Sequence, residues 1–155
     1  MFQHVNNVSQ QMYFDLGKAD FYRQVLQDDV LSGTSRIITA ATANSFKEQI
    51  RMEDDIYVTT TVAKVGNKSI TLFQQIIGRN AAGRETVKTE STSVMVAFDF
   101  DRQESVTVPE RWRRNLATQW PEYWLNPTAC CQFLTSGYNG SSGCCSAYSL
   151  RVTGW

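Results

Sequence analysis

The sequence predicts an α+β fold in which an antiparallel sheet packs against one long helix. Near the start of the chain, apolar residues recur at steps of three and four, as on one face of an amphipathic helix. These residues are Val8, Met12, Leu16, Ala19, Tyr22 and Leu26. From residue 36 to residue 100, strand-like segments alternate with short polar turns instead. A helix followed by successive antiparallel strands is the pattern of an α+β domain.

We expect the helix to run from about Val8 to Gln27, with its apolar stripe facing the sheet. Asn6 and Asn7 stand directly before it, where a carboxamide can accept a hydrogen bond from a free backbone N–H group. Gly17, in the middle of this helix, lowers helix stability by about 1 kcal/mol relative to alanine. Glycine at such a position is typical of a helix whose backbone approaches another element closely.

Four strands are expected, at residues 36–46, 56–64, 69–77 and 86–100. The turn between the second and third strands contains Gly66 and Asn67, two residue types that accept a positive φ. Pro109 then opens a short helix, because proline is favoured at the first helical position. The apolar face of this second helix comprises Trp112, Leu116 and Trp120.

The composition limits the possible functions. The 155 residues allow one domain of ordinary size, and a hydrophobic content of 42% supports a packed core. Fifteen basic residues balance fifteen acidic ones, which argues against a nucleic-acid partner, since such binders carry excess Lys and Arg. No run of about 18 apolar residues predicts a membrane span. The start of the sequence shows no charged-then-apolar leader, so no secretory signal is expected.

The last part of the chain differs in composition, which predicts a domain at 1–120 and a tail at 121–155. Of the 30 charged residues, the tail holds only Glu122 and Arg151. It also holds all four cysteines, as the pairs Cys130-Cys131 and Cys144-Cys145. Adjacent cysteines fit a zinc site poorly, and disulfides would require an oxidising compartment. We therefore expect incidental thiols, no metal, little secondary structure and few contacts with the domain.

The start of the chain also carries a motif. His4-Val5-Asn6-Asn7, followed by Tyr13-Phe14-Asp15, resembles D-x-x-G-H-V-N-N-x-x-Y-x-x-Y-F of the 4-hydroxybenzoyl-CoA thioesterase-like family, within the hotdog-fold superfamily. The likeness continues at V-G-N-K-S (65–69), V-A-F-D-F (96–100) and V-P-E-R-W-R-R (108–114). It implies a hotdog fold, with a curved sheet around the central helix and a first strand that would precede Met1.

The resemblance further implies an enzyme that hydrolyses a fatty or aromatic acyl-CoA to free acid and CoA, without metal or redox cofactor. In the family, N–H groups at the amino end of the helix polarise the thioester carbonyl. His4 and Asn7 match the catalytic part of the motif, and Asn6, Tyr13, Lys68 and Ser69 match its substrate-binding part. The resemblance also implies that this chain forms a homodimer, with the two sheets side by side and active sites between the subunits, or a homotetramer.

The sequence departs from the family at three positions. The catalytic aspartate, which attacks the carbonyl or activates a water, lies four residues before the histidine and would fall one position ahead of Met1. Gln3 replaces the glycine before His4, and Gln10 replaces the first tyrosine. We therefore expect the printed chain to be nearly inactive, and an upstream strand with an aspartate directly before Met1 to restore hydrolysis.

Each candidate residue also has a structural interpretation. His4 could simply bond a nearby carbonyl, the two asparagines could serve only as helix caps, and Lys68 could belong to a solvated rim. Asp15, on the helix, is a less favoured candidate for a catalytic carboxylate. The alternative function is that of a non-catalytic hotdog protein, either a degenerate paralogue that lacks the catalytic aspartate or an acyl-CoA-binding or scaffold protein. A hotdog dehydratase fits less well, because its histidine would have to lie within the helix. We expect a cytoplasmic protein, or a mitochondrial one if a targeting segment precedes Met1.

Overall fold

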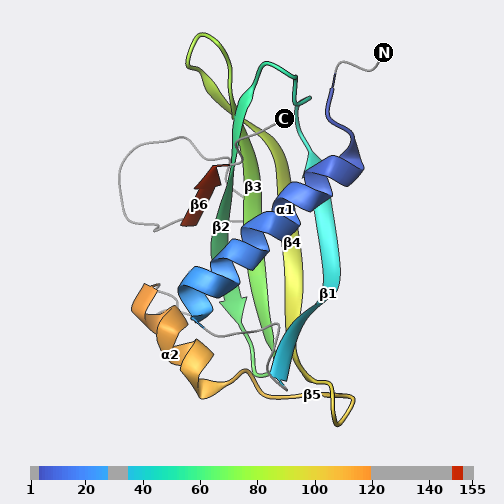
Figure 1. The fold of residues 1–155 in the computed structure, drawn as a ribbon, viewed down its shortest axis with the longest axis vertical. Helices are drawn as coiled ribbons and strands as arrows, with labels where there is room; N and C mark the ends of the chain where they lie inside the picture. Colours follow the sequence, from blue (N-terminus) through green and yellow to red (C-terminus); the bar gives the residue numbers. More distant parts are fainter. Residues whose placement is uncertain (1–3, 28–34, 120–147, 152–155) are drawn as a thin grey trace.

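The computed structural model describes residues 4–27, 35–119 and 148–151 of the chain. The elements are α1 (Asn7–Phe21), η1 (Tyr22–Leu26), β1 (Ser35–Phe46), β2 (Asp55–Val65), β3 (Ser69–Arg79), β4 (Glu85–Asp99), β5 (Glu104–Ser105), α2 (Glu110–Gln119) and β6 (Tyr148–Arg151). A sheet forms one layer, and α1 crosses one of its faces diagonally (Figure 1). α2 lies at the far end of α1, near the lower edge of the sheet in that view.

The main sheet has the strand order β1-β4-β3-β2-β6, and the short β5 pairs with Phe98 and Asp99 of β4, on the edge opposite β1. Every pairing between these strands is antiparallel. The four long strands agree with the expected segments to within two residues at each end. The expected α+β fold is therefore confirmed.

The turn between β2 and β3 is closed by a hydrogen bond of 2.7 Å from the N–H of Gly66 to the carbonyl of Ser69. The positive φ expected there is not adopted. Among the described residues, the left-handed conformation occurs at Gln27, Gly83 and Gln103. Gln27 directly follows the π-helical turn η1, so the long helix ends where the sequence predicts.

The face that α1 turns to the sheet is not the one expected. Val8, Met12 and Leu16 are 71%, 60% and 53% exposed, and Ala19 is exposed as well. The buried face of α1 instead comprises Gln10, Tyr13, Phe14, Gly17, Lys18, Asp20 and Phe21. The first four members of the apolar stripe were thus assigned to the wrong face, and only Tyr22 and Leu26 are buried as predicted. The three aromatic rings of the buried face remove more apolar area from water than the aliphatic stripe would.

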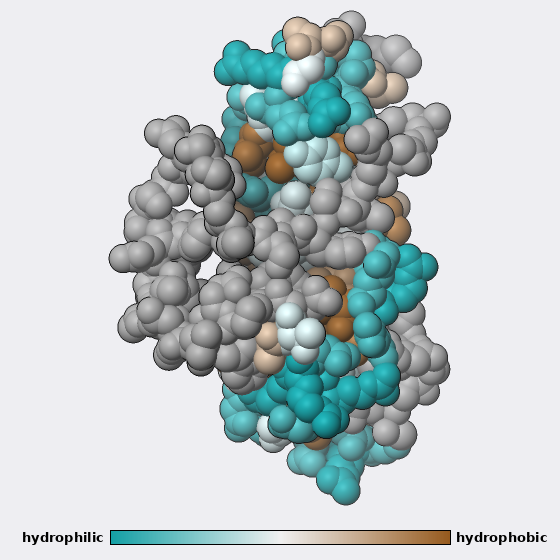
Figure 2. Space-filling model, turned by 90° about the vertical axis from the view of Figure 1, so that its left-hand side faces the viewer, coloured by the Kyte–Doolittle hydropathy of each residue, from teal (hydrophilic) through white to brown (hydrophobic). Residues whose placement is uncertain are grey.

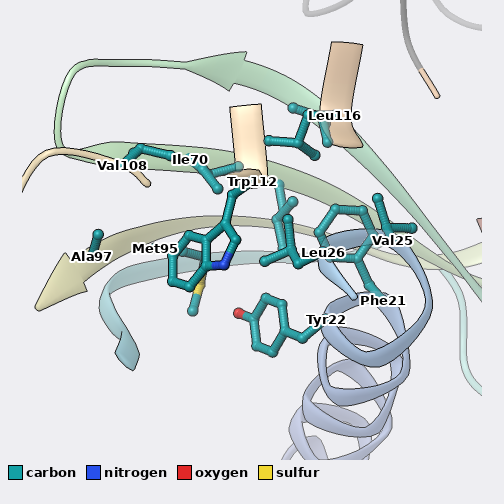
Figure 3. Packing of buried hydrophobic residues seen from close by; sticks show 12 residues of the cluster. Phe21, Tyr22, Val25, Leu26, Ile70, Met95, Ala97, Val108, Trp112 and Leu116 are labelled. Atoms are coloured by element: carbon teal, nitrogen blue, oxygen red, sulfur yellow. The ribbon is translucent and has the colours of Figure 1, made fainter. Parts of the chain in front are cut away.

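Two apolar clusters pack between the helices and the sheet. The larger joins η1 and α2 to the lower half of the sheet, and in it the indole of Trp112 lies between Tyr22, Met95 and Leu26 (Figure 3). Trp112 and Leu116 are buried as predicted, whereas Trp120 lies outside the described residues. The smaller cluster lies under the first half of α1 and comprises Val5, Tyr13, Phe14, Ile50, Ile56, Val58 and Ile76. It anchors the start of the chain to the sheet.

Four residues of the tail belong to the sheet. β6 pairs antiparallel with β2, from Tyr57 opposite Arg151 to Thr60 opposite Tyr148. The expectation of few contacts with the domain is therefore wrong for this segment, because the outer edge of β2 offers unpaired N–H and C=O groups to an extended chain. The four cysteines lie outside the described residues. Within the part that is described, no helix is long and apolar enough to cross a membrane.

Candidate active site at the start of α1

Asn6 caps α1. Its backbone is extended, and its Oδ1 accepts a hydrogen bond of 2.8 Å from the N–H of Ser9. The N–H of Gln10 makes the first helical bond, of 3.1 Å, to the carbonyl of Asn6. Among the described residues, no acceptor meets the N–H groups of Asn7 and Val8. The first turn carries no acidic residue, so this helix end presents two donors and the positive end of the helix dipole.

The segment before the helix is fixed to the sheet. His4 forms an antiparallel bridge with Arg51, and the N–H of Val5 donates to the carbonyl of Ile50 at 3.0 Å. On the other side, the carbonyl of Val5 accepts from Nε2 of the buried Gln10 at 3.2 Å. Thr89 of β4 in turn donates its hydroxyl hydrogen to Oε1 of Gln10. Both polar groups of the Val5 backbone are thus bonded, while the His4 side chain is exposed.

Two neighbouring cavities open beside this segment. One, of about 500 Å³, is lined by His4, Gln49, Arg51, Met52 and Glu53. The other, of about 620 Å³, shares Gln49, Arg51 and Glu53 with the first and extends to Lys88 and the turn at residues 80–82. Both lie at the end of the sheet where the start of α1 meets the loop between β1 and β2 (Figure 1). The turn between β3 and β4 is at the same end, and the surface there is mostly hydrophilic (Figure 2). A polar ligand group could therefore lie between His4 and this loop.

Charged residues under the loop form a compact group. The ammonium of Lys88 lies 3.3 Å from Oδ2 of Asp54 and 3.4 Å from Oε2 of Glu48. The Asp54 side chain is only 4% exposed, and its Oδ2 also accepts from the N–H of Arg51 at 3.0 Å. The hydroxyl of Thr86, and then Lys88, lower the pKa of Glu48 by hydrogen bonding to its carboxylate.

The structure separates the residues that the sequence predicts for the site. His4, Asn6 and Asn7 lie together at the start of α1. Tyr13 lies on the buried face of α1, within the smaller cluster, where burial raises the pKa of its phenol. Asn6 serves as the cap that the sequence allowed for.

Lys68 and Ser69 lie at the opposite end of the sheet, Lys68 in the turn between β2 and β3 and Ser69 at the first position of β3 (Figure 1). The ammonium of Lys68 donates to the carbonyl of Ser105 at 2.7 Å, and Ser69 pairs with Val96. The full length of β2 lies between this turn and His4, a span of roughly 30 Å for 11 extended residues. One subunit therefore does not bring the two groups together.

Sequence reasoning missed Arg51 and Glu53, which share a cavity with His4. They lie about fifty residues away in a loop without periodicity, so no spacing pattern could have linked them to the motif. Gln10 was noted only as a departure from the family motif, whereas its side chain holds Val5 in place. Within the described residues, no group of three or more His, Cys, Asp or Glu side chains is placed to hold a metal ion.

Comparison with known proteins agrees with this architecture. A predicted thioesterase from Bacillus stearothermophilus is 24% identical, with a TM-score of 0.64 over 75% of this chain and 83% of that one. A mutant 4-hydroxybenzoyl-CoA thioesterase in complex with 4-hydroxybenzoyl-CoA is 12% identical, with a TM-score of 0.64 over 73% of this chain and 86% of that one. A Staphylococcus aureus protein in complex with CoA is 13% identical, with a TM-score of 0.65 over 78% and 75% of the two chains.

At these identities the solved structures establish the fold, which is the hotdog fold that the motif implied. No curated protein matches the chain. A family model described as the thioesterase-like superfamily matches residues 1–116, which is more than half of the sequence. The chain therefore belongs to the thioesterase-like superfamily.

Proposed function

We propose that this protein hydrolyses acyl-CoA thioesters at the amino end of α1. The observation that carries the proposal is the pair of N–H groups of Asn7 and Val8, which meet no acceptor within the described part of the chain and lie beside a cavity lined by His4. Two such donors can bind the carbonyl oxygen of a thioester and stabilise the negative charge that develops on it when the carbon is attacked. Superfamily membership and the two CoA-containing complexes with the same fold support this assignment.

Hydrolysis also needs a carboxylate that attacks the carbonyl carbon or removes a proton from the attacking water. By the family motif, this group lies four residues before His4, a position that residues 1–155 do not include. We assign His4 to the thioester-binding side of the site, because its side chain lines the cavity next to the helix end. CoA leaves as the thiol when the carbon–sulfur bond breaks.

We further propose that two copies share each site. β1 is an edge strand, and among the described strands only β4 pairs with it. Residues 37–46 carry no charge, and most of their side chains are exposed. A long uncharged edge is a template for pairing with another strand, and most homo-oligomers have two-fold symmetry. Pairing of two β1 edges across a two-fold axis would make one continuous sheet.

Such pairing would also complete the site. An antiparallel arrangement places the Phe46 end of β1, next to the start of α1, beside the opposite end of the partner's β1. The turn that carries Lys68 and Ser69 lies at that opposite end. Residues that are about 30 Å apart within one subunit would thus approach each other across the interface.

The decisive experiment compares two substitutions at Asn7, made in a protein that carries an upstream strand and an aspartate directly before Met1. Asn7→Pro deletes the backbone N–H at a helical position where proline is tolerated, whereas Asn7→Ala removes only the carboxamide. Hydrolysis of acyl-CoA is measured by the release of the CoA thiol. We expect kcat of the proline variant to fall about 10²–10³-fold, because one donor to the oxyanion is lost. The alanine variant should retain most of the activity.

Equal activity in the two variants would refute the role of the helix end. Binding of CoA without hydrolysis in the parent protein would favour the alternative, a non-catalytic acyl-CoA-binding protein.

A second experiment tests the dimer. The double substitution Ala41→Glu and Ala43→Glu places charges on exposed positions of the β1 edge. We expect sedimentation analysis to show a dimer for the parent and a monomer for the variant, with hydrolysis lost as well. A monomeric, fully active parent would overturn the shared site.

A further inference from the structure

We infer that two consecutive residues of β4, Lys88 and Thr89, are positioning residues. They hold His4 and the start of α1 in position against the sheet. The inference rests on the proposed function, since it concerns the same site. Neither side chain lines the cavity that contains His4. Both act through other residues, by two separate routes that meet at Val5.

A β-bulge explains why both side chains face the helix. Thr89 pairs with Ile76 and Val87 pairs with Ile77, so Lys88 is the extra residue with no partner on β3. In a regular strand, consecutive side chains point to opposite faces. Here Lys88 is 8% exposed and Thr89 is fully buried. Bulges re-aim side chains in this way and are frequent next to active sites.

The first route runs from Thr89. Its hydroxyl donates to Oε1 of Gln10, and Nε2 of the same side chain donates to the carbonyl of Val5 at 3.2 Å. Gln10 is 5% exposed, so its carboxamide has little access to water as an alternative partner. The orientation of this carboxamide is fixed at both ends, and with it the turn that leads into α1.

The second route runs from Lys88 through the loop between β1 and β2. The carbonyl of Lys88 accepts from the N–H groups of Lys47 and Glu48, at 2.8 and 3.0 Å. Its ammonium lies within 3.4 Å of the carboxylates of Glu48 and Asp54, near the beginning and the end of the loop. Asp54 then accepts from the N–H of Arg51 at 3.0 Å. The loop held in this way supplies the carbonyl of Ile50 that bonds the N–H of Val5, and Arg51, which bridges to His4.

Gly78 makes the path of Lys88 possible. A Cβ atom at this position would lie 2.5 Å from Cε of Lys88 and 3.1 Å from its Cγ. Any larger residue at this position would therefore push the lysine side chain away from Asp54. Because Lys88 is flexible at its far end, the change should redirect the ammonium at little cost to the rest of the sheet.

Two variants and one control test the inference, in the same parent protein as above, which carries an upstream strand and an aspartate directly before Met1. Lys88→Met keeps the length of the side chain but removes the charge, and Gly78→Ala displaces the intact lysine. Lys47→Met is the matched control, because it removes a neighbouring lysine from a surface pair with Glu90. The readout is amide hydrogen exchange at Val5, with Leu72, buried in β3, as the internal reference.

In both test variants, the amide of Val5 should exchange about tenfold faster than in the parent, whereas the exchange rate at Leu72 should change less than about twofold. The control should change neither amide. In the hydrolysis assay, kcat should fall about tenfold or more with KM nearly constant, because displacement of the helix end affects the transition state more than binding of the CoA portion.

Unchanged exchange at Val5 in Gly78→Ala would overturn the inference, even if Lys88→Met fails to fold. A purely structural role would raise exchange at Val5 and Leu72 together and leave kcat unchanged in the folded variants, which would also overturn it. If the parent protein does not hydrolyse acyl-CoA, the proposed function fails, while exchange at Val5 still decides whether the bulge positions the helix end.

Discussion

Gly17 is the position at which two opposing effects on stability can be weighed from the structure. An alanine there would gain about 1 kcal/mol of helix propensity, since glycine is unfavourable in a helix interior. The added Cβ, however, would lie 3.0 Å from Nε2 of Gln74, 3.0 Å from Cγ1 of Val58 and 3.3 Å from Oγ1 of Thr60. These atoms belong to the sheet under α1, so the methyl group would enter the closest contact between helix and sheet.

The cost of this contact has two parts. Overpacking against a buried branched side chain typically costs about 1–3 kcal/mol. Gln74 is fully buried, and its Nε2 donates to the carbonyl of Phe14 at 3.1 Å and to Thr60 at 3.0 Å. Displacing it weakens two hydrogen bonds worth about 1 kcal/mol each. We therefore expect Gly17→Ala to lower the free energy of unfolding by about 1–3 kcal/mol, after the gain in propensity is subtracted.

The measurement is urea unfolding, monitored by circular dichroism. The urea midpoints of variant and parent are compared, provided that the slope of unfolding free energy against urea concentration is the same in both. Shortening the side chain at the contact, in Gln74→Ala, should make room for the methyl group. The glycine substitution should then cost less in that background than in the parent, and the difference is the coupling energy of a double-mutant cycle. A stabilised Gly17→Ala protein would refute the reasoning, because it would mean that α1 is free to move away from the sheet.

Three further predictions follow from the described contacts. Trp112→Ala should cost about 3–5 kcal/mol in urea unfolding, since the indole is fully buried between the helices and the sheet, and a loss below 1 kcal/mol would contradict the packing. Asn6→Ala should cost about 0.5–2 kcal/mol, because the N–H of Ser9 loses its acceptor, whereas Asn6→Asp should keep or raise the melting temperature. The pKa of Glu48 is below its usual 4.5 in the folded protein, mainly because Thr86 bonds the carboxylate. Its contribution to stability is therefore present above that value and lost as the pH falls through the folded pKa. Stability measured from pH 6 to pH 3 should accordingly fall less steeply in Glu48→Gln than in the parent.

Much of the fold is determined by the sequence alone. The β-branched segments and the turns between them define four strands to within two residues. Both helices begin where a cap residue or a proline directs them to begin. These features depend on interactions between residues close in the sequence, such as a cap with the third N–H after it. The motif around His4 likewise locates the amino end of α1 as the candidate site.

The orientation of α1 was decided only by the tertiary structure. Periodicity shows which residues share a helix face, but α1 has apolar residues on two faces. The aromatic face with Phe14 and Phe21 is buried, although it also carries Gln10, Gly17 and Lys18, and the aliphatic stripe is exposed. Burial of the larger rings outweighs burial of the stripe, and the polar side chains on that face find partners in the sheet or along the helix.

The tertiary structure also decided what surrounds the candidate site. The bulge at Lys88, the loop that supplies Ile50 and Arg51, and the pairing of β6 with β2 all join residues far apart in the chain. Local sequence determined the helix end and its cap, because a cap and its N–H partner lie within one turn. The contacts that fix this end against the sheet depend on strand register and on a single extra residue in β4, which no local pattern in the sequence specifies.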